Sequence, residues 1–334
     1  MDRDATIAVV GAGAIGCVVG GLLKKAGHDV ILIAREKQAE AINRDGLKID
    51  GVTGGINVKI EARTKLDFSP GIVLLAVKSQ DVTEACGEIK EAAPAAQVVT
   101  MQNGLRADRE AAEVLGEENV IGCVVFFSAS YLEPGRIDYT NKGSLVVGSP
   151  FGRRKLAEDA AAILNDAVAT KVTGNITGAR HTKLLLNVMG NSLDAITGMR
   201  LSECASYPVM RRLAVAVMKE SLAVMERSGV RLESLPGMPA TMLKLLIKLP
   251  LPLGTILMGA VLKSEDQESS TLQSIKRGRP VETQYLNGEI VRMAKELDLC
   301  APVNEKALEI IEEVSKTGRF LSPDEAGKRF EGLI

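Results

Sequence analysis

The chain has 334 residues, more than one hydrophobic core usually organises, so we expect two domains. Apolar residues make up 46% of it and charged residues 25%, a balance that excludes the disordered and fibrous classes. The formal net charge of -1 provides no large field to attract nucleic acid or an anionic membrane, so neither is an expected partner.

Cysteine usage and the first residues indicate where the protein works. Its five cysteines are odd in number, widely spaced and never form a CxxC pair, which argues against disulfides and against a zinc site. The first ten residues lack the long apolar region of a signal peptide, so we expect a cytoplasmic protein with no metal. The apolar stretch 242–262 is interrupted by Lys244, Lys248, Pro250 and Pro252, which predicts a pair of helices packed into the protein.

The first 34 residues read as one βαβ unit. Residues 6–10 are an apolar strand, GAGAIG is a tight turn, an apolar helix follows to residue 27, and residues 29–34 form a second strand. Further strands are predicted at 72–77, 97–101 and 120–127, with alanine-rich helices between these strands. This alternation predicts an α/β fold with a doubly wound parallel sheet of the Rossmann type, and we assign it residues 1–174.

The pattern changes after residue 130. Pro-Gly and Asn-Lys-Gly turns within 131–149 predict a closing antiparallel hairpin. From about residue 176 the strand signal ends, so we expect an all-helical second domain over 175–334. Its predicted helical segments are 181–196, 208–227, 239–262, 282–298 and 304–316.

A dinucleotide fingerprint lies between the first strand and the first helix. Gly11 permits the tight turn, Gly13 lets the backbone approach a pyrophosphate, and Gly16 lets the helix pack on the strand. The first amides of the helix, at Ala14 and Ile15, would face the anion. The alternative is a glycine-rich turn that binds no ligand.

The end of the second strand bears on the choice of nucleotide. Where an NAD enzyme places an acid for the ribose hydroxyls, this sequence has Ala34 and Arg35. A guanidinium suits a 2′-phosphate, which favours NADP over NAD. The alternative is that Arg35 is a solvated residue at a helix start and that Glu36 takes the acidic role.

Two polar residues follow later strands of the predicted sheet. Lys78 comes after the strand IVLLAV, and Asn103 comes after the strand ending at Met101, so both are expected at the carboxyl edge of the sheet. There they could hold the nicotinamide ribose or a substrate carboxylate. As isolated residues they would more often be ordinary turn positions.

In the helical half, Lys183, Asn187 and Asn191 recur every four residues and form one polar ridge on an apolar helix. The ridge could supply interhelical hydrogen bonds, or it could supply catalysis. A lysine near apolar packing becomes a better proton donor near neutral pH, which suits ketone reduction.

A second polar cluster precedes a later helix and contains Ser269, Ser270, Lys276, Arg277, Arg279 and Glu282. The fingerprint, Lys78, the Asn-Gly at 103–104, the polar ridge and this cluster together resemble the ketopantoate reductase (2-dehydropantoate 2-reductase) family, over nearly the whole chain. The resemblance implies a Rossmann domain followed by a helical domain like the C-terminal one of 6-phosphogluconate dehydrogenase. It also implies reduction of 2-dehydropantoate to pantoate with NADPH, a step of pantothenate biosynthesis.

The resemblance also assigns roles. It implies that Lys183 is the general acid and that Glu282 orients it or binds the substrate hydroxyl. The substrate-binding residues that it implies are Asn103, Asn187, Asn191 and Ser270. The cofactor-binding residues that it implies are Gly11, Gly13, Ala14, Ile15, Gly16, Arg35, Lys78, Asn103 and Glu282.

Two departures from the family pattern concern the substrate. Family members often carry Asp where Ser274 stands, and a further substrate-contacting Asn is expected where this chain has Leu201. The alternatives are therefore a reductase of another small 2-keto acid or of an imine, and a non-catalytic NADPH-binding sensor. Besides the small keto acid, a second copy of the chain in a homodimer is a candidate partner.

Overall fold

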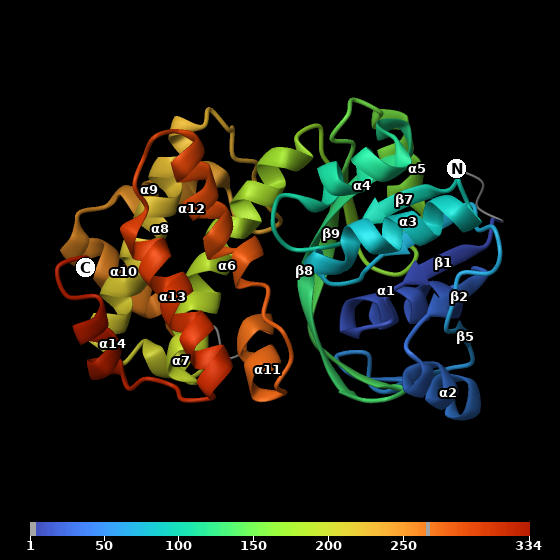
Figure 1. Ribbon diagram of the computed structural model, residues 1–334, viewed down its shortest axis with the longest axis horizontal. Helices are drawn as coiled ribbons and strands as arrows, with labels where there is room; N and C mark the ends of the chain where they lie inside the picture. Colours follow the sequence, from blue (N-terminus) through green and yellow to red (C-terminus); the bar gives the residue numbers. More distant parts are fainter. Residues whose placement is uncertain (1–4, 265–267) are drawn as a thin grey trace. The chain divides into compact units, whose positions relative to one another are not determined.

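The computed structural model describes residues 5–264 and 268–334, and the chain divides into two compact units at Thr177 and Gly178 (Figure 1). The first unit contains a mostly parallel sheet with helices, and the second is built of helices. The predicted fold class, a Rossmann-type domain followed by a helical domain, is confirmed.

The centre of the sheet is parallel because its strands are joined through helices. The five strands predicted from the sequence are neighbours in the order β8, β7, β6, β1, β2, and each adjacent pair among them is parallel. Their bounds are β1 (Ile7–Val10), β2 (Val30–Ile33), β6 (Ile72–Leu75), β7 (Gln97–Thr100) and β8 (Val120–Glu133). The chain continues from β1 to β2 on one side and later returns to β6 on the other, so the strand order reverses between β1 and β6. Ligands of such sheets bind at that reversal.

Four short strands extend the sheet and were not predicted. They are β3 (Leu47–Gly51), β4 (Ile56–Val58), β5 (Glu61–Arg63) and β10 (Thr170–Val172). Each has five residues or fewer and carries exposed polar side chains, so no apolar run marks it in the sequence. β4 pairs with its chain neighbour β3, but the other three take their places by pairing with strands more distant in the chain, such as β3 with β9 (Arg136–Gly148).

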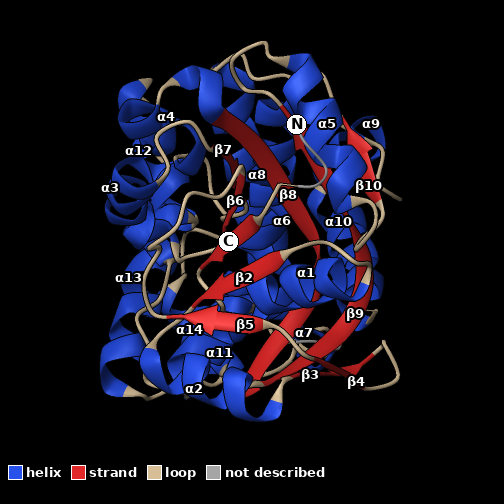
Figure 2. Cartoon of the chain, turned by 90° about the vertical axis from the view of Figure 1, so that its right-hand side faces the viewer, coloured by secondary structure: helices blue, strands red, loops and turns tan. Residues whose placement is uncertain are grey.

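The predicted antiparallel hairpin is present, but one of the two turns predicted within it is absent. β8 and β9 pair across the tight Pro134–Gly135 turn as two long strands, drawn in red in Figure 2. The Asn-Lys-Gly segment lies inside β9 and makes no turn there. A Cβ on Gly143 would lie 1.7 Å from the carbonyl oxygen of Phe126, so this glycine serves a close strand approach near a register irregularity.

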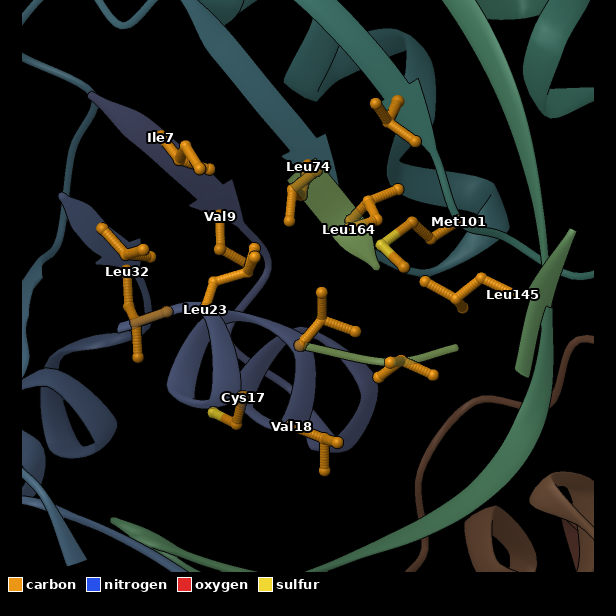
Figure 3. Close-up of a cluster of buried hydrophobic side chains, with 14 of the residues drawn as sticks. Ile7, Val9, Cys17, Val18, Leu23, Leu32, Leu74, Met101, Leu145 and Leu164 are labelled. Atoms are coloured by element: carbon orange, nitrogen blue, oxygen red, sulfur yellow. The ribbon is translucent and has the colours of Figure 1, made fainter. Parts of the chain in front are cut away.

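Helices cover both faces of this sheet, which explains why its central strands are apolar throughout. Successive residues of β1 belong alternately to two buried clusters, Ile7 and Val9 to one and Ala8 and Val10 to the other. Figure 3 shows the first cluster, where Val9 faces Leu23 of the first helix. The helices of this unit are α1 (Ala14–Lys25), α2 (Glu36–Asp45), η1 (Ser79–Asp81), α3 (Val82–Ala92), α4 (Ala107–Leu115), η2 (Glu117–Asn119) and α5 (Arg154–Leu164).

The second unit follows the predicted helical segments, with several of them divided. Proline at the first helical position starts α8, α13 and α14, and Gly318, at φ 71°, ends α13. Its elements are α6 (Ile176–Thr197), α7 (Leu201–Cys204), α8 (Pro208–Arg227), α9 (Ala240–Lys248), α10 (Leu251–Lys263), α11 (Ser270–Lys276), η3 (Thr283–Tyr285), α12 (Asn287–Glu296), α13 (Pro302–Thr317) and α14 (Pro323–Arg329).

The apolar stretch 242–262 forms the expected pair of helices, α9 and α10, but it is not fully packed into the protein. Leu245 is 67% exposed and Ile256 is 64% exposed, so the outer faces of both helices are apolar and open. The prediction of burial was wrong here because an apolar run has no periodicity from which an exposed face could be recognised. Within residues 5–264 and 268–334, no helix is long and apolar enough to span a membrane.

Candidate active site

The glycine turn after β1 is fixed by close packing. Gly11 has φ 98°, and a Cβ there would lie 2.5 Å from the backbone nitrogen of Val77. A Cβ on Gly16 would lie 2.4 Å from the carbonyl oxygen of Gly11. Both positions therefore require glycine for the turn to pass between β6 and α1.

Gly13 differs from these two because no protein atom requires it. It is exposed, its φ is -81°, and a Cβ built there meets nothing within 4 Å. It caps α1, whose first turn carries no acidic residue and leaves the amides of Ala14, Ile15 and Gly16 without partners inside the helix. An open, uncrowded helix start of this kind fits a pyrophosphate. The residues present therefore fit a dinucleotide.

Arg35 follows Ala34 just beyond the end of β2, as predicted. It is the N-cap residue of α2 and is exposed, with no side-chain hydrogen bond to the helix. Glu36, in the first turn of α2, is exposed as well. Both candidate groups for the adenosine ribose thus stand at the same strand end.

Gln38 supports the glycine turn and was missed in the sequence. Its Nε2 donates to the carbonyl oxygen of Ala12 at 3.2 Å, and its Oε1 accepts from the Tyr131 hydroxyl at 2.9 Å and the Gly135 amide at 2.8 Å. This buried amide joins α2, the turn and the β8–β9 hairpin. No sequence signal marks it, because its partners lie up to 97 residues away.

Lys78 and Asn103 lie in loops that the structure brings together at the carboxyl edge. The Ser79 hydroxyl donates to the carbonyl oxygen of Asn103 at 3.3 Å. Gln102 Nε2 donates to the carbonyl oxygens of Leu75 at 2.9 Å and of Val77 at 3.1 Å. Since the Gly11 turn packs against Val77, three loops meet where the strand order reverses.

The polar ridge lies on α6. Lys183 and Asn187 are half-buried, and Asn191 is buried. Asn191 donates to the carbonyl oxygen of Asn187 at 2.8 Å, and its Oδ1 accepts from the Thr271 hydroxyl at 2.7 Å and lies 3.5 Å from the Ser270 hydroxyl. The ridge is therefore bonded at its far end to the start of α11. Asn191 serves this attachment, which matches the alternative of interhelical hydrogen bonding at that position.

Asp194 makes a second attachment, which was also missed. Its carboxyl oxygens accept from the Ser269 amide at 2.6 Å and the Ser269 hydroxyl at 2.8 Å. The Ser269 hydroxyl in turn caps α11 by accepting from the Leu272 amide. Burial raises the pKa of Asp194 to about 7, against the lowering effect of these donors. Ser270 is exposed beside this anchored residue.

Glu282 is half-buried and precedes α12, whose first residue is bonded to α6. Asn287 Nδ2 donates to the Ser192 hydroxyl and to Asn304 Oδ1, both at 3.0 Å. Asn304 Nδ2 donates to Glu220 Oε1 at 2.8 Å. This network fixes the segment that follows Glu282 against the helix that carries Lys183.

The first unit is a parallel sheet with an open glycine turn where the strand order reverses, and the second is a helical unit with the polar ridge that contains Lys183. These features define a class of two-domain oxidoreductases that use a pyridine nucleotide. The comparisons with known proteins narrow this class. Residues 7–151 match the family model "Ketopantoate reductase PanE/ApbA", and residues 175–315 match "Ketopantoate reductase PanE/ApbA C terminal". The chain belongs to the ketopantoate reductase family, as its resemblance predicted.

Individual relatives agree over most of the chain. A 2-dehydropantoate 2-reductase of Pyrococcus abyssi is 31% identical over 301 residues, covering 89% of this chain and 94% of the relative. The crystal structure of a PanE/ApbA family ketopantoate reductase from Ralstonia eutropha superposes with a TM-score of 0.80 at 29% identity, covering 93% and 98% of the two chains. A D-mandelate dehydrogenase solved with NADH and anilino(oxo)acetate has the same fold, with a TM-score of 0.80 at 18% identity and coverage of 93% and 99%.

Proposed function

We propose that this chain reduces 2-dehydropantoate to pantoate with NADPH, as a cytoplasmic enzyme of pantothenate biosynthesis. The observation that carries the proposal is the glycine turn, in which packing requires glycine at positions 11 and 16, whereas the space around Gly13 is open and would admit a ligand. The relatives named 2-dehydropantoate 2-reductase support this substrate.

The cofactor would lie along the carboxyl edge of the sheet. The amides at the start of α1 would hold the pyrophosphate, and Arg35 would pair with the 2′-phosphate that distinguishes NADPH from NADH. Lys78 and Asn103, held by the bonded loops after β6 and β7, would contact the nicotinamide ribose or the substrate. When bound, the reduced nicotinamide supplies the hydride that the carbonyl carbon receives.

The protein supplies the proton. We assign the general acid to the ammonium of Lys183, which would donate to the carbonyl oxygen as negative charge develops there. Glu282 would orient that ammonium or bind the substrate hydroxyl. Asn187 and Ser270 would bind the keto acid, while Asn191 would act by holding α11 and so positioning Ser270.

The departures at Ser274 and Leu201 make another small 2-keto acid the second candidate substrate. The test follows the loss of NADPH absorbance with 2-dehydropantoate, with a panel of other 2-keto acids, and with NADH in place of NADPH. We expect 2-dehydropantoate with NADPH to be the best pair. Turnover with a different keto acid alone would replace the named substrate, and preference for NADH would assign the ribose to Glu36 instead of Arg35.

Replacing Lys183 tests the mechanism in the same assay. Lys183→Ala should lower turnover by about 100- to 10,000-fold, the range of general acid catalysis, while NADPH still binds. Lys295→Ala, at an exposed position of α12, is the matched control and should turn over normally. Near wild-type turnover in Lys183→Ala would remove this lysine from the mechanism, and tight NADPH binding with no turnover on any substrate would indicate a sensor.

A further inference from the structure

The helical unit contains a cavity that shares no residue with the proposed active site. It has a volume of about 510 Å³ and lies between the α7–α8 turn and α10. Its lining residues are Ala205, Ser206, Arg211, Ile256, Gly259, Ala260 and Lys263. This volume is within the range of small-molecule sites, roughly 300–1,000 Å³. All of these residues belong to one compact unit.

The charge of the lining has one sign. Arg211 and Lys263 contribute two cations, and none of the described lining residues is acidic. The segment 234–264, which includes α9 and α10, has no Asp or Glu, and Glu265 and Asp266 follow it in the sequence. Two cations that line one cavity can form a local anion site, even in a chain whose net charge is close to zero.

Arg211, one of the lining residues, has an unsatisfied donor. Its Nε is buried and has no hydrogen-bond partner among the described residues. A buried donor of a charged group that bonds to nothing destabilises the free protein, and a guanidinium that turned this edge toward an oxyanion in the cavity would recover that cost. The arginine stem lies against Gly259, where a Cβ would come within 2.9 Å of Arg211 Cδ and 3.2 Å of Nη1. The absence of a side chain at Gly259 therefore makes room for the guanidinium.

The remaining walls are mostly apolar. Ala205 and Ala260 are small, and Ile256 continues into the exposed apolar face of α10 with Leu253 and Leu257. Ser206 adds one hydroxyl. A bare inorganic anion would leave this apolar wall unused, whereas an anion with a short hydrocarbon body would use both parts.

We propose that this cavity is a second binding site, for a small organic carboxylate whose charged end pairs with Arg211 and Lys263 and whose apolar body lies on Ile256 and Ala260. The planar guanidinium edge suits a carboxylate because it can donate two parallel hydrogen bonds. The site does not depend on the proposed reductase activity.

The test is a ligand-observed NMR titration of the full chain with hexanoate, with hexanol and inorganic phosphate as comparison probes. Hexanoate should bind, hexanol should not, and phosphate should bind more weakly. Arg211→Met should weaken hexanoate by about tenfold or more, the usual loss for a charge-assisted hydrogen bond. Arg212→Met, at the exposed neighbouring position, is the matched control and should bind like the wild type.

Two further variants keep the result interpretable if Arg211→Met folds poorly. Gly259→Ala keeps every charge but displaces the arginine, and Lys263→Met keeps the arginine but removes the second cation. Both should weaken hexanoate. A carboxylate held only at the proposed active site would bind all of these variants alike, which would overturn the proposal. Equal losses in Arg211→Met and Arg212→Met, or phosphate binding as tightly as hexanoate, would overturn it too.

Discussion

Asp194 shows how a single buried acid can fix a functional segment. Its side chain is fully buried on α6, and both of its oxygens accept from Ser269, the residue that caps α11 and precedes Ser270. Burial disfavours the charged carboxylate more than these two donors favour it, so the pKa rises to about 7. The proton that the folded protein then keeps has a consequence for stability.

We expect Asp194 to make the protein less stable as the pH rises. The folded state holds the proton up to about pH 7, whereas the unfolded chain releases it near pH 4. Between these values the folded state binds more protons, so its stability falls with pH, by at most about 1.4 kcal/mol per pH unit. Asp194→Asn is neutral at every pH and should lack this decline.

The measurement is the free energy of unfolding in urea for both proteins at pH 5, 6, 7 and 8. Other titrating groups cancel in the difference between the two proteins. The wild type should lose stability relative to Asp194→Asn from pH 5 to pH 7 and should level off above that. A difference that stays constant over the whole range would mean that Asp194 is already ionised in the folded protein.

At the scale of single residues, the sequence predicts only those roles that a contiguous pattern marks. The three glycines of the fingerprint were recognised because strand, turn and helix are contiguous. Gln38, Asp194 and Asn287 were not recognised, because each acts on partners that are distant in sequence. A buried polar side chain reveals its role only through those partners.

At the scale of elements, the turn between β1 and α1 combines two different requirements for glycine. Gly16 is buried and its hydrogen stands where a Cβ would meet the Gly11 carbonyl, so the packing of α1 on the sheet depends on it. Gly13 is exposed and has free space around its α-carbon. A methyl group at the two positions therefore tests folding and binding separately.

We expect Gly13→Ala to retain the stability of the wild type within about 0.5 kcal/mol, because it fills only open space. The same methyl group would occupy the path of the pyrophosphate, so NADPH affinity should fall at least about tenfold. Gly16→Ala should instead lower the free energy of unfolding by about 1–3 kcal/mol through overpacking. Urea unfolding and a fluorescence titration with NADPH measure the two effects; unchanged NADPH affinity in Gly13→Ala would argue that the turn binds no dinucleotide.

The strands, too, could be predicted from the sequence only where a local pattern marks them. The apolar parallel strands were predicted because they are buried on both faces, whereas β3, β4, β5 and β10 are short and partly exposed. The Asn-Lys-Gly segment was misassigned to a turn because turn chemistry and a strand irregularity use the same residues. Whether such a segment forms a strand or a turn depends on the strand with which it pairs, and a single sequence does not reveal that pairing.

For the whole molecule, the division into two units distributes the proposed functions. The glycine turn belongs to the first unit and the lysine ridge to the second, and each unit has its own buried residues. The chain also carries buried thiols in both units. Cys17 lies in α1 of the first unit, and Cys204 lies in α7 of the second. Each thiol reports on the opening of the unit that buries it.

We expect NADPH to protect the two units unequally against opening. Burial raises the pKa of Cys17 to about 12 and that of Cys204 to about 11, so a thiol reagent reacts with either one only when its unit opens. Nucleotide at 100 times its dissociation constant stabilises the unit that binds it by about 2.7 kcal/mol. Labelling of Cys17 should then slow about a hundredfold, while labelling of Cys204 should stay nearly unchanged.

Mass spectrometry after timed labelling measures both rates, and the exposed Cys300 should react at once in either condition. Equal slowing at Cys17 and Cys204 would contradict this expectation, because it would mean that the two units open in one cooperative step.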